Sequence, residues 1–136
     1  MEKIILSILV LIISLSCSLD RENPLDVEGL EPNKVTNFEG RYIGNQNVEL
    51  NWIPLSDADG YYIYRSKSYD SVYQRINESD ELNDGNYETY IDDDITLVTG
   101  WYYYKISAYK LIDDRRLEGE RTIVLGPTGD PCVYVQ

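Results

Sequence analysis

The sequence predicts an all-β protein, an antiparallel sandwich of about seven strands. Short runs of aromatic and β-branched residues recur along the chain, separated by clusters of Asp, Asn, Gly and Pro. The chain also contains 13 Tyr but only 1 Phe. Tyrosine combines a high β-propensity with a polar tip, so it suits a thin sheet with one face in water. No segment after residue 17 has a helical period, so we expect no helix there.

The strongest strand signal lies at residues 101–109, with the sequence WYYYKISAY. One alternate set contains Tyr102, Tyr104 and Ile106, whereas the other set mixes polar with aromatic residues. A period of two residues is typical of a half-buried strand. We therefore expect Tyr102, Tyr104 and Ile106 to lie in the core.

The other strands are shorter. In residues 47–52, Val48, Leu50 and Trp52 alternate with polar residues, which places Trp52 in the core. Residues 113–116 (Asp-Asp-Arg-Arg) are expected to form the charged connection that follows the long strand. The remaining strands are expected at residues 35–38, 61–65, 72–76, 87–91 and 121–125.

The first 16 residues read as a signal peptide. The aliphatic run at residues 4–13 is shorter than the roughly 20 residues that span a bilayer, and it matches the apolar part of a secretory signal helix. The cysteine that follows this run resembles the lipobox of bacterial lipoproteins. The resemblance implies cleavage before Cys17 and lipidation of its thiol. Buried acyl chains contribute about 0.8 kcal/mol per CH₂, so several of them anchor a protein stably.

The lipobox resemblance also bears on location. Ser18 after the cysteine resembles the default for the outer membrane, so we expect a lipid-anchored protein of the cell envelope, at the outer membrane or cell surface. In the alternative, the signal is an ordinary secretory one, and Cys17 stays a thiol or pairs with Cys132. Residues 17–33 are rich in charges, Pro and Gly, and are expected to form a flexible tether. Residues 128–136 are expected to be a C-terminal tail, in which Val133, Tyr134 and Val135 have strand character and could add to a sheet edge.

Four short motifs follow one another along the chain: Val48-x-Leu50-x-Trp52, Gly60-Tyr61-x-Ile63-x-Arg65, Tyr90-x-Asp92 and Tyr102-x-Tyr104-x-Ile106-x-Ala108. Their order and spacing resemble those of a bacterial fibronectin type III domain. The resemblance implies an immunoglobulin-like sandwich over residues 34–127. It also implies that Trp52 fills the core and that Tyr102 forms the hydrogen-bonded tyrosine corner of that family.

The candidate binding face is a set of outward aromatic residues. If Tyr61 and Tyr102 point inward, then Tyr62, Tyr64, Trp101 and Tyr103 point outward on two strands that neighbour each other in that topology. Exposed aromatic rings with polar tips suit protein or sugar surfaces. The alternative is that these cross-strand pairs only stabilise the sheet, at about 0.2–1 kcal/mol each.

Other functions find little support in the composition. A formal net charge of −12 argues against nucleic acid, whose phosphates require clustered Lys and Arg. The chain has no His, so the usual general base and the commonest zinc ligand are missing. The acidic runs at 57–60 and 92–94 lack a complete calcium loop, and we interpret them as solvated turns. We therefore expect no enzyme, no metal and no cofactor.

These observations predict a non-catalytic cell-envelope lipoprotein whose domain serves as an interaction, adhesion or spacer module. Its expected partners are the membrane, through the lipid anchor, and an unknown protein or glycan. Two alternatives remain open: a carbohydrate-binding module that uses the tyrosine face, and an accessory subunit of an envelope assembly.

Overall fold

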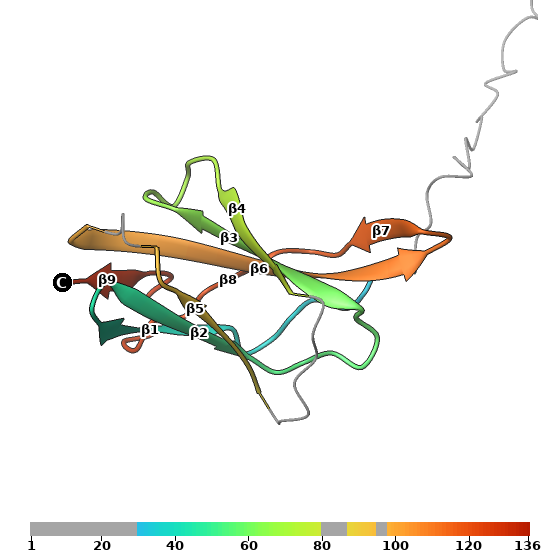
Figure 1. Ribbon diagram of the computed structural model, residues 1–136, viewed down its shortest axis with the longest axis horizontal. Helices are drawn as coiled ribbons and strands as arrows, with labels where there is room; N and C mark the ends of the chain where they lie inside the picture. Colours follow the sequence, from blue (N-terminus) through green and yellow to red (C-terminus); the bar gives the residue numbers. More distant parts are fainter. Residues whose placement is uncertain (1–29, 80–86, 95–97) are drawn as a thin grey trace, which may run out of the picture.

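The computed structural model describes residues 30–79, 87–94 and 98–136. This part of the chain forms strands and no helix, in two layers that enclose one core (Figure 1). One layer is a three-stranded sheet of order β1-β2-β5, and the other has the order β4-β3-β6-β7, with β8 and β9 also paired to β6. The predicted all-β fold is therefore confirmed.

The strands are β1 (Glu39–Gly44), β2 (Asn47–Trp52), β3 (Gly60–Ser66), β4 (Gln74–Ser79), β5 (Glu88–Asp92), β6 (Gly100–Ile112), β7 (Arg115–Glu118), β8 (Thr122–Ile123) and β9 (Val133–Val135). Strand β6 is the longest and organises the larger sheet. It pairs with β3 over residues 103–109, with β9 at one end and with β7 at the other (Figure 1). Its aromatic and β-branched residues explain its length, because such side chains fit a pleated surface.

The core lies between the two layers. Trp52, Tyr102, Tyr104 and Ile106 are all buried there, on the inward side of β2 and β6. The Trp52 ring packs edge-on against Tyr61, with ring centroids 5.3 Å apart. Aromatic pairs in such geometry contribute about 0.5–1.5 kcal/mol beyond the burial of their area. The period-two alternation therefore places these side chains on the correct side of each strand.

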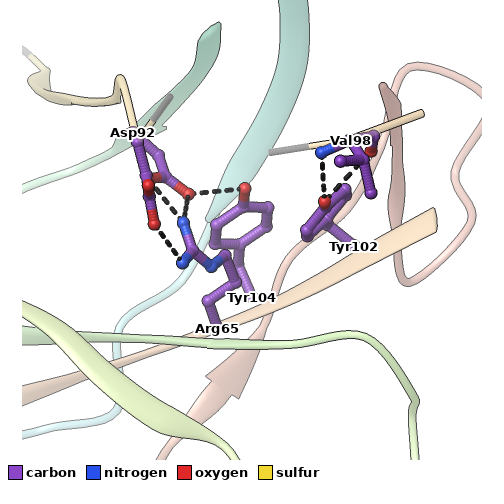
Figure 2. Close-up of polar contacts among 6 residues, drawn as sticks. Arg65, Asp92, Val98, Tyr102 and Tyr104 are labelled. Carbon is purple, nitrogen blue, oxygen red and sulfur yellow. Dashed lines mark hydrogen bonds and ion pairs between the residues drawn. The ribbon is translucent and has the colours of Figure 1, made fainter. Parts of the chain in front are cut away.

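A tyrosine corner closes one end of the core. The hydroxyl of Tyr102 accepts a hydrogen bond from the backbone N–H of Val98 at 2.8 Å and donates one to the Val98 carbonyl at 3.0 Å (Figure 2). Between them, Gly100 has a φ of +150°, which a residue with a side chain rarely adopts. The role that the family resemblance implied for Tyr102 is thus present in the structure.

The first strand was predicted at the wrong place. Residues 35–38 are not a strand, because Asn37 has a φ of 54° and interrupts the extended backbone. Val35 and Phe38 are buried all the same. The first strand is instead β1, whose sequence EGRYIG has no clear apolar alternation and therefore did not predict a strand. Asn45 and Gln46, both with positive φ, join β1 to β2 in a two-residue hairpin turn.

The charged connection at 113–116 is shorter than predicted. Only Asp113 and Asp114 form the turn, with φ values of 50° and 61°, which match a type I′ hairpin. The two arginines that follow belong to β7 and pair back onto β6. The strand expected at 72–76 likewise starts later, at Gln74, and Val72 is exposed.

The C-terminal tail is part of the sandwich. Residues 128–136 were expected to lie outside the domain, but Val133 and Val135 of β9 are buried in the core. The tail turns back through a hydrogen bond from the Gly126 N–H to the Asp130 carbonyl, and Tyr134 then pairs with Trp101 of β6. The packing of two alternate valines therefore extends the sandwich beyond the predicted limit at residue 127.

The predicted signal peptide, Cys17 and most of the tether lie outside the described residues. Of the expected tether, only residues 30–33 are described. Over the ranges given above, no helix has the length and apolarity needed to cross a membrane.

Candidate functional site

The outer face of the larger sheet carries the four predicted binding residues. Tyr62 and Tyr64 of β3 and Trp101 and Tyr103 of β6 all lie on the side away from the main core. However, Tyr62 and Tyr64 are each only 6% exposed. The prediction of one open face is therefore wrong for these two tyrosines, and the face divides into two halves.

The covered half is a cluster of Tyr62, Tyr64 and Tyr109, against which Tyr73 packs. Tyr62 and Tyr109 stack with their ring centroids 4.7 Å apart. Basic side chains lie over these rings, at distances from 3.8 to 4.9 Å from cation to centroid. The pairs are Arg75 on Tyr62, Arg121 on Tyr64, Arg116 on Tyr109 and Lys105 on Tyr73. Their aliphatic stems exclude water while their charges interact with the ring faces.

The carboxylate of Glu118 links three side chains of this covered half by hydrogen bonds. Glu118 Oε1 accepts hydrogen bonds from the Tyr64 hydroxyl at 2.8 Å, the Ser107 hydroxyl at 2.7 Å and Arg121 Nε at 2.9 Å. Burial raises the pKa of Glu118, but these three donors outweigh burial and hold the pKa below its usual value. Burial, followed by the contact with Glu118, raises the pKa of Tyr64. Tyr64 is therefore a structural residue.

The open half lies at the other end of β6. Trp101 is 53% exposed, and its ring lies 4.8 Å from that of Tyr134, which is 41% exposed. Tyr103 follows on the same face, and its ring packs edge-on at 6.0 Å against that of Tyr69, which is 51% exposed. We call these four residues the open aromatic patch. It suits surface contact, because its rings offer rigid area and polar tips without a reactive group.

Two members of the patch were missed by the sequence analysis. Tyr134 belongs to β9, which was expected to be a tail, and Tyr69 lies in the connection from β3 to β4. Only the pairing of β9 with β6 brings Tyr134 opposite Trp101. The strand character of residues 133–135 indicated that they could add to a sheet edge, but nothing in the sequence indicated the contact with Trp101 or placed Tyr69 beside Tyr103.

The acidic run at 92–94 is not a solvated turn. Asp92 is only 2% exposed, and both its oxygens lie 2.8 Å from Arg65 Nη1 (Figure 2). Tyr104 donates its hydroxyl proton to the same carboxylate at 2.8 Å, and Arg65 Nη2 donates to Asp94 at 2.7 Å. Burial, followed by the charge of Asp92, raises the pKa of Tyr104. The cluster ties the two sheets together.

The aspartates of the acidic run at 57–60 accept hydrogen bonds from neighbouring loop and strand segments. Asp59 accepts a hydrogen bond from the backbone N–H of Leu111 at 2.7 Å, and Asp57 accepts two from Asn33. Among the residues that the structure describes, no group of three or more carboxylate or cysteine side chains is placed to hold a metal ion.

Cys132 is partly buried just before β9. Burial, followed by the charge of Asp130, raises the pKa of its thiol. Its pairing with Cys17, which lies outside the described residues, stays a prediction.

Comparisons with known proteins show the fold. No protein-family model and no curated protein matches this sequence. The crystal structure of an Fn3-like protein from Clostridium thermocellum matches with 20% identity and a TM-score of 0.50, over 71% of this chain and 94% of that one. The crystal structure of FN3tt matches with 20% identity and a TM-score of 0.51, over 67% of this chain and 87% of that one. The chain therefore has a fibronectin type III-like sandwich fold.

Proposed function

We propose that this chain is a non-catalytic cell-envelope lipoprotein, anchored through Cys17, whose sandwich binds a partner protein through the open aromatic patch. The lipobox resemblance supports the anchor, and the polar composition of residues 17–33 supports a tether between membrane and domain. In this arrangement the domain serves as an interaction module held a short distance from the membrane.

The exposure of Trp101 beside Tyr134 is the observation that carries the binding proposal. Basic side chains cover the outward rings of Tyr62 and Tyr64, whereas Trp101 and Tyr134 are 53% and 41% exposed. Tyrosine and tryptophan are enriched at protein interfaces, where they bury large areas at a low cost in side-chain entropy. A tilted ring pair also suits a sugar, so a glycan is the second candidate ligand.

Site-specific crosslinking in the envelope tests the patch. A photoreactive residue at Trp101 is expected to capture a defined partner, whereas one at Leu111 is not. Leu111 is a matched control, because it lies on the same strand and is also 53% exposed. Equal capture at both positions would contradict the proposal. Binding to a glycan array that is lost in Trp101→Ala would instead support the glycan.

Mass spectrometry of the mature N-terminus tests the anchor separately. The expected species begins at Cys17 and carries acyl chains. The variant Cys17→Ser should leave the membrane fraction while the sandwich stays folded. A mature chain that begins elsewhere without acyl chains would end the lipoprotein proposal and leave the patch proposal standing.

A further inference from the structure

Glu88 is the first residue of β5, and it is only 1% exposed. Neither of its carboxylate oxygens accepts a hydrogen bond within the described part of the chain. Its partner across the sheet is Trp52, the last residue of β2, and the indole N–H of Trp52 also lacks a hydrogen-bond partner there. A buried carboxylate without a partner is costly, because burial disfavours its charged form.

The same strand carries a second buried carboxylate that contrasts with the first. Asp92 is the last residue of β5, and it binds Arg65 and Tyr104 of the opposite sheet. Among the strands that the structure describes, β5 pairs with β2 alone, so it is an edge strand of its sheet. The Asp92 end of β5 is therefore bound to the opposite sheet by an ion pair. The Glu88 end carries a carboxylate without a hydrogen-bond partner in the described part of the chain.

The surroundings of Glu88 do not compensate its charge. Burial raises the pKa of Glu88 to about 7. The indole N–H of Trp52 lies near the carboxylate but outside hydrogen-bond geometry, and it opposes this rise only in part. The titratable group that faces it from β3 is the phenol of Tyr61, whose pKa is raised by burial and, more weakly, by Glu88 and Asp57. The preceding residue, Tyr87, is 59% exposed, so the surface of the domain lies one residue away along the chain.

We infer that β5 is a proton-controlled strand that is closed on β2 when Glu88 is protonated and opens at its Glu88 end when Glu88 ionises. The Arg65–Asp92 pair holds the other end in both states. Opening exposes Trp52 and the neighbouring edge of the three-stranded sheet to solvent. The exposure of Trp52 and of this sheet edge therefore depends on pH in the neutral range. This inference is independent of the proposed function.

Hydrogen exchange of the full chain tests the opening. Ionisation of Glu88 is favoured in the open state, so the opening constant of β5 rises with pH. After correction for intrinsic exchange, opening should increase roughly ten- to a hundredfold between about pH 5 and about pH 8. The increase should vanish in Glu88→Gln, and the amides of β3 should show no such step. The same increase in Glu88→Gln would overturn the inference, as would its absence in the wild type.

Fluorescence gives a second readout. The chain has 2 Trp, so Trp101→Phe leaves Trp52 as the reporter. Its emission should shift to longer wavelength as the pH rises, with a midpoint near 7, and should stay constant when Glu88→Gln is added. If Glu88→Gln does not fold, Glu88→Met serves as the neutral replacement. A midpoint that either neutral variant leaves unchanged would refute the assignment to Glu88.

Discussion

The two halves of the outer sheet face share one strand and one residue pattern, yet they differ in exposure. Tyr64 and Tyr103 both point away from the main core, from neighbouring strands. Tyr64 is covered by Arg121 and bonded to Glu118, whereas Tyr103 lies beside the exposed Trp101. The difference shows that alternation decides the side of the sheet. Long side chains from flanking segments decide whether that side is exposed to solvent.

The largest expected effect is a difference in the free energy of unfolding between variants of these two tyrosines. Tyr64→Ala should lower the free energy of unfolding by about 3 kcal/mol, because it removes a buried ring and leaves the Glu118 oxygen short of a donor. Tyr103→Ala should lower it by less than about 1 kcal/mol. Urea unfolding of both variants measures the contrast. Equal losses would show that the two halves do not differ in packing.

Removal of the charge at Glu118 should cost about 1–3 kcal/mol, because three donors lose their charged acceptor. The pKa of Glu118 in the fold lies below its ordinary value of 4.5. The unfolded state thus binds the proton more tightly, and the contribution of Glu118 to stability is present above about pH 4.5 and lost as the pH falls below it. Urea unfolding across acidic pH should show this loss in the wild type and a smaller one in Glu118→Gln.

A smaller effect is expected from the cation that covers Tyr64. Arg121→Ala removes both the charge and the stem that lies over the ring, and it should cost about 1 kcal/mol. Arg121→Met keeps an apolar cover and should recover part of this loss. If the two variants unfold at the same urea concentration, the stem does not contribute to the cover.

The smallest effect concerns the open aromatic patch. A double-mutant cycle of Trp101→Ala and Tyr134→Ala should give a coupling of about 0.5 kcal/mol, because the two residues are 53% and 41% exposed. A coupling above about 2 kcal/mol would mean that the pair is a stabilising element like the covered half, and it would weaken its assignment as a binding surface.

The sequence predicted the elements whose side chains alternate clearly. Residues 47–52 match β2, and residues 101–109 fall within β6. The segments that were missed lack such a pattern. The β1 sequence contains only two large apolar residues, and β9 is three residues long. Such segments become strands because a long neighbour supplies their hydrogen bonds and a place in the core.

Residue order alone determined the all-β class and the inward set of Trp52, Tyr102, Tyr104 and Ile106, because both follow from local periodicity. The tyrosine corner was implied by the resemblance to fibronectin type III domains. Only the tertiary structure decided that Tyr62 and Tyr64 are covered and that Tyr134 meets Trp101. It also decided that Glu88 is buried without a hydrogen-bond partner among the described residues, while Asp92 binds Arg65. These outcomes depend on contacts between residues far apart in the sequence, which no local pattern records.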